Sequence, residues 1–98
     1  MNTKLLDLYI AHFILSRKPR SYNIKGAPYK IGQKVKILDN PNNDETFDRK
    51  FANKIGEMMH FEYDGGCGQS FPRDPMIGVR LANGKRDEFW KEELELVS

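Results

Sequence analysis

The sequence predicts a mainly β fold, in which a small barrel of about five strands follows one N-terminal α-helix. Two observations lead to this prediction: short segments of alternating apolar and polar residues recur after residue 29, and turn-forming residues separate them. The chain has 98 residues, of which 39% are apolar and 31% charged, as in ordinary folded domains. A chain of this length buries about two thirds of its unfolded surface, which suffices for one core. We therefore expect a helix and basic linker over residues 1–28 and one barrel over residues 29–98.

The segment from Thr3 to Ser16 has the periodicity of an amphipathic helix. Thr3 can serve as its N-cap, and Asp7 lies near the positive end of the helix dipole. Leu8 and Leu15 fall outside the main apolar stripe, so the apolar surface is wider than one barrel face needs. We expect the helix to pack on the barrel or on a second copy of the chain, as a homodimer. Its apolar stripe comprises Leu5, Leu6, Tyr9, Ile10, Phe13 and Ile14.

This segment predicts neither a signal peptide nor a membrane span. Asp7 and His12 interrupt its apolar run, no small-residue cleavage site follows, and a helical span needs about 20 residues. Cys67 is the only cysteine, so an intrachain disulfide cannot form. We expect a cytoplasmic protein that does not associate with a membrane.

Residues 31–37 predict the first strand, because apolar residues alternate there with lysines. Turn-forming residues at 40–44 end it. In the next segment, residues 45–53, Phe47 and Phe51 are four positions apart. This spacing fits either a helical turn or two anchors of a long loop, and we favour the loop.

Residues 54–63 predict the second strand. In a regular strand alternate residues share a face, so Met59, Phe61 and Tyr63 would all point to one side. Gly56 would form a bulge at which this strand bends.

Residues 77–81 predict a strand that turns back at Asn83-Gly84, a sequence typical of β-hairpins. Two registers fit the residues that follow. A two-residue loop would set Leu81 beside Arg86, whereas a three-residue loop would hold Gly84 in a bulge. The second register would give the pairs Ile77 with Phe89 and Val79 with Asp87.

The end of the chain predicts two short elements. Lys91 to Leu94 has the composition of one tight helical turn. Leu96-Val97 would then add a short final strand that closes the barrel.

This order of elements resembles the SH3-like barrel. The nearest family is the barrel domain of the nitrile hydratase β subunit, together with small bacterial barrel proteins of the same build. The hydratase metal sits on cysteines of the partner subunit, so the resemblance implies an accessory or interaction module and not the activity. Residues 54–58 also resemble, more weakly, the glycine turn of KOW-type barrels that contact RNA or protein. The matching segments are residues 32–37, 54–58, 71–72, 78–81 and 87–94.

No motif for catalysis, a cofactor or a metal is predicted. Cys67 lies in a glycine-rich loop and could pair with His60, but a nucleophile also needs a third, orienting group. A metal site from these two residues with Asp64 and Asp74 has a spacing that matches no known motif. The loop at 65–68 also lacks the lysine and the Ser or Thr of a phosphate-binding loop.

An aromatic surface is the best functional lead in the sequence. Phe89 and Trp90 are neighbours in a predicted strand, so only one of the two rings can point into the core. With Tyr63, Phe71 and Pro72, the other ring would form an aromatic patch that binds protein. In the alternative, the N-terminal helix covers that ring.

The sequence therefore predicts a non-enzymatic module that binds a protein partner. The predicted contact residues are Leu6, Tyr9, Phe13, Tyr63, Phe71 and Trp90. A first alternative is a nucleic-acid- or ribosome-associated module, since basic residues dominate up to Asp39 and acidic residues thereafter. Its contacts would be Arg17, Lys18, Arg20 and Lys25. A second alternative is an accessory subunit whose loop from Gly65 to Gln69 touches a substrate.

Overall fold

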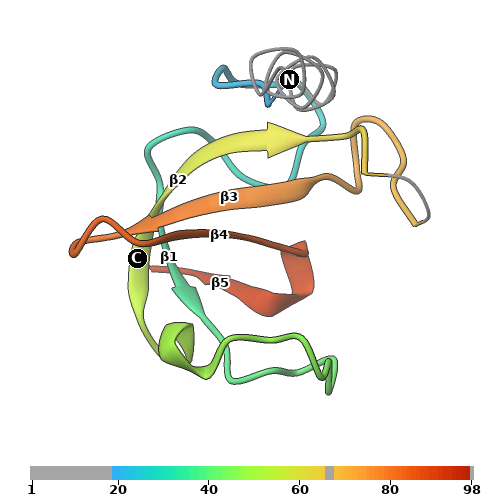
Figure 1. Ribbon diagram of the computed structural model, residues 1–98. Coiled ribbons are helices and arrows are strands. Elements are labelled where there is room, and N and C mark those ends of the chain that lie inside the picture. Colours follow the sequence, from blue (N-terminus) through green and yellow to red (C-terminus); the bar gives the residue numbers. More distant parts are fainter. Residues whose placement is uncertain (1–18, 66–67, 98) are drawn as a thin grey trace, which may run out of the picture.

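The structure is a computed structural model that describes residues 19–65 and 68–97. It contains one antiparallel five-stranded sheet with the strand order β4-β3-β2-β1-β5, so β4 and β5 are its edges. The mainly β prediction is confirmed, whereas the predicted N-terminal helix lies outside the described residues. The elements are β1 (Lys34–Ile37), η1 (Arg49–Phe51), β2 (Ile55–Glu62), β3 (Met76–Leu81), β4 (Arg86–Phe89), η2 (Lys91–Glu93) and β5 (Leu94–Leu96) (Figure 1).

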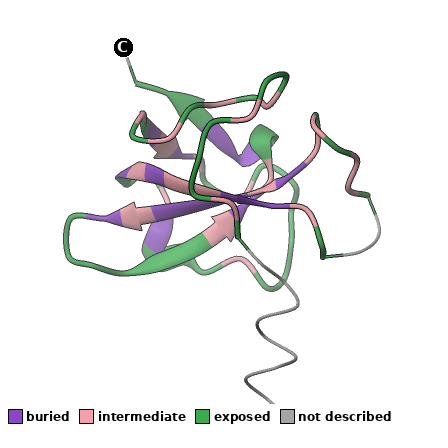
Figure 2. Cartoon of the chain, turned by 90° about the horizontal axis from the view of Figure 1, so that it is seen from above, coloured by how far each residue is buried: buried purple, intermediate pink, exposed green. Residues whose placement is uncertain are grey.

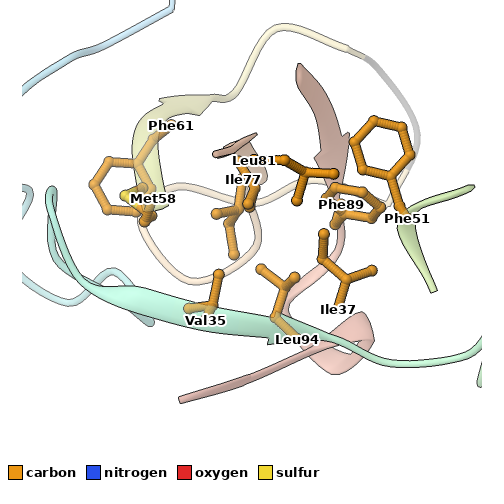
Figure 3. Packing of buried hydrophobic residues seen from close by; sticks show 10 residues of the cluster. Val35, Ile37, Phe51, Met58, Phe61, Ile77, Leu81, Phe89 and Leu94 are labelled. Carbon is orange, nitrogen blue, oxygen red and sulfur yellow. The ribbon is translucent and has the colours of Figure 1, made fainter. Parts of the chain in front are cut away.

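The sheet curls around a core of aliphatic and phenyl groups. Phe61, Ile77 and Phe89 lie directly across from one another on β2, β3 and β4, and all three are buried. Figure 3 shows Val35 and Ile37 of β1 pointing toward this row from the opposite side. Each fully buried side chain of this size contributes about 1.5–3 kcal/mol. The complete cluster is Val35, Ile37, Phe51, Met58, Phe61, Ile77, Val79, Leu81, Phe89 and Leu94.

A bulge in β2 changes which residues face this core. Met58 and Phe61 are both fully buried although they are three positions apart, and the register to β3 shifts between Met58 and His60. An odd spacing on one face requires an extra residue in the strand. The prediction that Met59 shares the inner face with Phe61 is therefore wrong.

The bulge is also not at Gly56, as the sequence predicted. Gly56 is paired regularly with Val35 on one side and with Leu81 on the other. It must be glycine for another reason: a Cβ there would lie 2.5 Å from Val79 Cγ1 and 2.8 Å from the carbonyl oxygen of Arg80. The neighbouring strand comes too close to Gly56 for any side chain.

The hairpin adopts the second of the two predicted registers. The Leu81 amide donates to the Lys85 carbonyl at 2.8 Å and the Gly84 amide to the Leu81 carbonyl at 2.9 Å, which leaves a three-residue loop. Gly84 has a φ of 89°, a conformation that favours glycine. The predicted pairs Ile77 with Phe89 and Val79 with Asp87 are confirmed.

The other predicted elements of the barrel are present with shifted boundaries. Residues 45–53 form a loop that contains the single turn η1, capped by Asp48, whose carboxylate accepts from the Lys50 amide at 2.9 Å. This turn buries Phe51 with its ring 5.6 Å from that of Phe89. The predicted helical turn at the end of the chain is η2, and β5 begins two residues earlier than expected and pairs with β1. Figure 2 shows that buried residues follow the strands while the hairpin tip and the long loops are exposed.

We predict that Gly56→Ala destabilises the fold by about 1–3 kcal/mol, because the added methyl group overlaps Val79 and the backbone of β3. Urea denaturation followed by circular dichroism measures this free energy. Glu57→Ala, on the outer face of the same strand, is the matched control and should change stability by less than about 0.5 kcal/mol. Equal stability of wild type and Gly56→Ala would contradict the close approach of the strands.

Candidate protein-binding surfaces

Tyr63 and Phe71 form the centre of an exposed aromatic cluster. Their ring centroids are 4.8 Å apart at an angle of 61°, an edge-to-face contact. The Tyr63 hydroxyl donates to the Pro72 carbonyl at 2.8 Å, which holds the loop of Phe71 against the end of β2. Phe71 remains 60% exposed, so much of its ring is available for a partner.

Arg20 completes this cluster. Its backbone extends the sheet, because its amide donates to the Phe61 carbonyl at 2.7 Å and its carbonyl accepts from the Phe61 amide at 3.0 Å. The guanidinium thereby lies 5.3 Å from the Tyr63 ring centre and 5.0 Å from that of Phe71. Such cation–π contacts contribute about 0.5–1 kcal/mol at exposed sites. Partial burial raises the pKa of the Tyr63 phenol, and the Arg20 charge offsets part of this rise.

The structure divides the predicted contact residues. We define the aromatic cluster as Arg20, Tyr63, Phe71 and Pro72; it includes Arg20, which the sequence had assigned to nucleic-acid contacts. Lys25 is exposed, away from any ring contact among the described residues. The other predicted contacts, Leu6, Tyr9, Phe13, Arg17 and Lys18, lie outside the described residues.

Trp90 makes no ring contact with the aromatic cluster, although its ring lies beside Gly68 of the loop that leads to Phe71. It is half-buried while its neighbour Phe89 is 2% exposed, which confirms that only one of the two rings is in the core. No described ring is in contact with the Trp90 ring. Trp90 instead starts η2, where its amide donates to the Glu93 carboxylate at 2.8 Å.

Glu93 is a buried carboxylate near enough to three other carboxylates for their charges to act on its pKa. Burial raises its pKa, the hydrogen bond from the Trp90 amide lowers it in part, and the charges of Asp44, Glu92 and Asp87 raise it further. The three neighbours come from the loop after β1, from η2 and from β4, and all are exposed. Within residues 19–65 and 68–97, none of these three forms an ion pair.

We define the acidic cluster as Asp44, Asp87, Glu92 and Glu93. The sequence showed an acidic C-terminal run that contains three of these residues, but nothing in it placed Asp44 beside them. Thr46 donates its amide and its hydroxyl to Asp44, each at 2.8 Å, and these bonds lower the pKa of Asp44. Asp44 therefore stays ionised in the cluster. Lys91 does not neutralise the acidic cluster, because the ammonium group of Lys91 is paired with Asp74 at 3.1 Å.

Among the residues weighed for catalysis and metal binding, those that the structure describes form no catalytic or metal-binding group. His60 Nε2 lies 2.9 Å from Glu88 Oε2 on the outer face of the sheet, directly above Gly78. Cys67 lies outside the described residues. In the described part of the chain, no three His, Cys, Asp or Glu side chains are arranged to hold a metal ion. No helix there is both long and apolar enough to cross a bilayer.

Comparison with known proteins identifies a family. Residues 20–98 match the family described as "CarS bacterial SH3 domain". The antirepressor protein CarS of Myxococcus xanthus is 35% identical over 75 residues, which are 76% of this chain and 66% of that protein. The chain thus spans just under two thirds of this relative's length, and no solved structure matches it significantly. The SH3-like part of the predicted resemblance is confirmed, whereas these comparisons do not show the resemblance to the nitrile hydratase barrel.

We predict that Glu93→Gln stabilises the protein at pH 7, since glutamine still accepts from the Trp90 amide and carries no charge. Folding raises the pKa of Glu93, so the protonated side chain favours the folded state. This contribution to stability is complete below pH 4.5, the ordinary pKa of a glutamate, and is lost as the pH rises through the raised pKa. The advantage of the variant should therefore disappear below pH 4.5. Urea denaturation across this pH range measures it.

The control for this prediction is Glu92→Gln, which removes one exposed charge of the same cluster. It should give a smaller gain, because its carboxylate is not buried. A Glu93→Gln variant that is less stable than wild type at pH 7 would show that the buried charge does not oppose folding.

Proposed function

We propose that this chain, which belongs to the family of CarS bacterial SH3 domains, acts as an antirepressor by binding a repressor protein. The support for this partner is the relative in Myxococcus xanthus, which is named an antirepressor. The family is non-enzymatic, in agreement with the predicted absence of catalysis. Because a bacterial repressor acts on DNA inside the cell, we place the interaction in the cytoplasm.

The acidic cluster is the observation that carries the proposed binding mode. Asp44, Asp87 and Glu92 gather around the buried Glu93 without an ion-pair partner among the described residues. Their mutual repulsion is a cost that the isolated domain bears. Repressors hold DNA phosphates through lysine and arginine side chains, so a repressor presents a complementary basic surface. Binding to that surface would relieve the repulsion and block DNA at the same time.

Trp90 and the aromatic cluster would add apolar contact to this charged surface. Trp90 starts the turn that carries Glu92 and Glu93, and Phe71 is 60% exposed. Tryptophan, tyrosine and arginine are the residues that most often dominate binding energy at protein interfaces. The predicted contacts Tyr63, Phe71 and Trp90 thus remain part of the proposed interface, with Arg20 added to them.

One copy of the chain suffices for this mode of action. The homodimer predicted through the N-terminal helix has no support from the comparisons. The contacts predicted for Leu6, Tyr9 and Phe13 therefore remain predictions, because they concern residues outside the described part of the chain.

We predict that affinity capture from the native cell with this chain as bait recovers a DNA-binding repressor. Reversing two exposed charges, Asp87→Lys with Glu92→Lys, should weaken the complex by about tenfold or more and make it less sensitive to salt. Calorimetry with the purified partner at low and moderate salt measures both effects. A gel-shift assay would show whether the wild-type chain releases the repressor from its DNA.

Glu57→Lys is the control, because it reverses a charge on the outer face of β2, away from the acidic cluster. It should leave the affinity for the repressor within about twofold. Capture of a partner that does not bind DNA would refute the antirepressor role. If the double charge reversal left the affinity for the repressor unchanged, only the role of the acidic cluster would be refuted, and the antirepressor role would stand.

A further inference from the structure

A basic groove lies at the end of the barrel opposite to the aromatic cluster. Its first hollow, of about 470 Å³, lies between the start of β2 and the β3–β4 hairpin. A second hollow, of about 250 Å³, shares Ile55, Leu81 and Ala82 with the first and extends it toward the loop before β2. We define the basic groove as Ile55 and the cations around it: Lys34, Lys50, Lys54, Arg80 and Lys85.

Ile55 forms the apolar floor of the groove. It is the first residue of β2 and is paired with Lys36 on the outer face, so the core does not cover it. Its side chain remains 52% exposed. A single exposed isoleucine needs no explanation by itself. Here, however, it lies in both hollows, where a ligand could bury it.

The positive charge of the groove is poorly neutralised within the chain. Glu57 is the one carboxylate that lines either hollow, and it lies 4.0 Å from Arg80. Arg86 stands directly across from Arg80 on β4, a like-charge pair that opposes folding. In the described part of the chain, no ion pair involves the four lysines of the groove. These cations are therefore available to an anionic ligand.

We propose that the basic groove is a second docking surface, for an acidic segment of a partner protein that places an aliphatic side chain on Ile55. The cations would pair with carboxylates of the segment, and Ile55 would give it an apolar anchor. Both features fit a peptide better than a nucleic acid. No aromatic ring lines either hollow to stack with a base, and the exposed Ile55 offers an apolar contact that a phosphate backbone cannot use.

This surface is separate from the one proposed for the repressor. The aromatic cluster lies by the loop that enters β3, and the basic groove lies by the hairpin that leaves it, at opposite ends of that strand (Figure 1). The acidic cluster lines neither hollow, and its charge is opposite to that of the basic groove, so the two surfaces select different partners. One chain could hold both at once, and the inference does not depend on the antirepressor role.

Selection from short random peptides displayed on phage tests the proposal. The full chain should enrich peptides rich in Asp and Glu that contain an aliphatic residue. In isothermal titration, the enriched peptide should bind about tenfold more weakly to Ile55→Gln, which removes the apolar floor and leaves the charge unchanged. Lys54→Glu should weaken it by a similar factor, and high salt should reduce its binding to wild type.

Two controls keep the result interpretable. Lys30→Glu reverses an exposed charge outside the groove and should change the affinity by less than about twofold. Thermal melts of each variant show that the fold is retained. Asp87→Lys with Glu92→Lys should leave peptide binding intact, which separates this proposal from that of the repressor-binding surface.

Four results would overturn the proposal. The first is a selection that does not enrich acidic peptides with an aliphatic residue, and the second is equal binding of such peptides to Ile55→Gln and to wild type. The third is labelled duplex DNA that binds more tightly than the peptide and whose binding is abolished by Lys54→Glu but not by Ile55→Gln. This result would assign the groove to nucleic acid. Concentration-dependent self-association that Ile55→Gln abolishes, measured by sedimentation, would assign it to a second copy of the chain.

Discussion

The fold depends on the curvature of β2, the strand that joins both halves of the sheet. Strand β2 pairs with β1 through its first residues and with β3 along most of its length. Two local features allow it to curve: the close approach of β3 at Gly56 and the bulge between Met58 and His60. Through this curvature, side chains of β1 and β5 meet those of β3 and β4 in one core. A flat sheet with the same residues would leave both inner rows exposed.

The same curvature separates the charges of the domain. The loop after β1, strand β4 and the turn η2 meet around Glu93, so carboxylates from three distant segments form the acidic cluster. Beside the β3–β4 hairpin, lysines from β1, the loop before β2 and the hairpin surround Ile55. Among the described residues, none of these carboxylates or lysines forms an ion pair. A nearly balanced chain thereby presents two surfaces of opposite charge.

The binding surfaces also differ from the core in how they are held. The aromatic cluster depends on the short pairing of Arg20 with Phe61 and on the hydrogen bond from Tyr63 to Pro72. The acidic cluster depends on the hydrogen bonds that Glu93 and Asp44 accept. These contacts are polar and lie at the surface, so a partner can bind and dissociate without opening the core. Such an arrangement suits a domain that acts by binding rather than by chemistry.

The sequence alone determined the mainly β class, the positions of β1 and β3, the turn at η2 and the split of Phe89 and Trp90, because alternation and turn residues are local signals. It also named Tyr63 and Phe71 as neighbours. It left the hairpin register open, placed the bulge at Gly56 and did not show that Arg20 lies over the rings of Tyr63 and Phe71. Only the tertiary structure decided these points, because each depends on which strand lies beside another. Asp44 near Glu93 and Ile55 among lysines are contacts between segments far apart in the chain, and no periodicity encodes them.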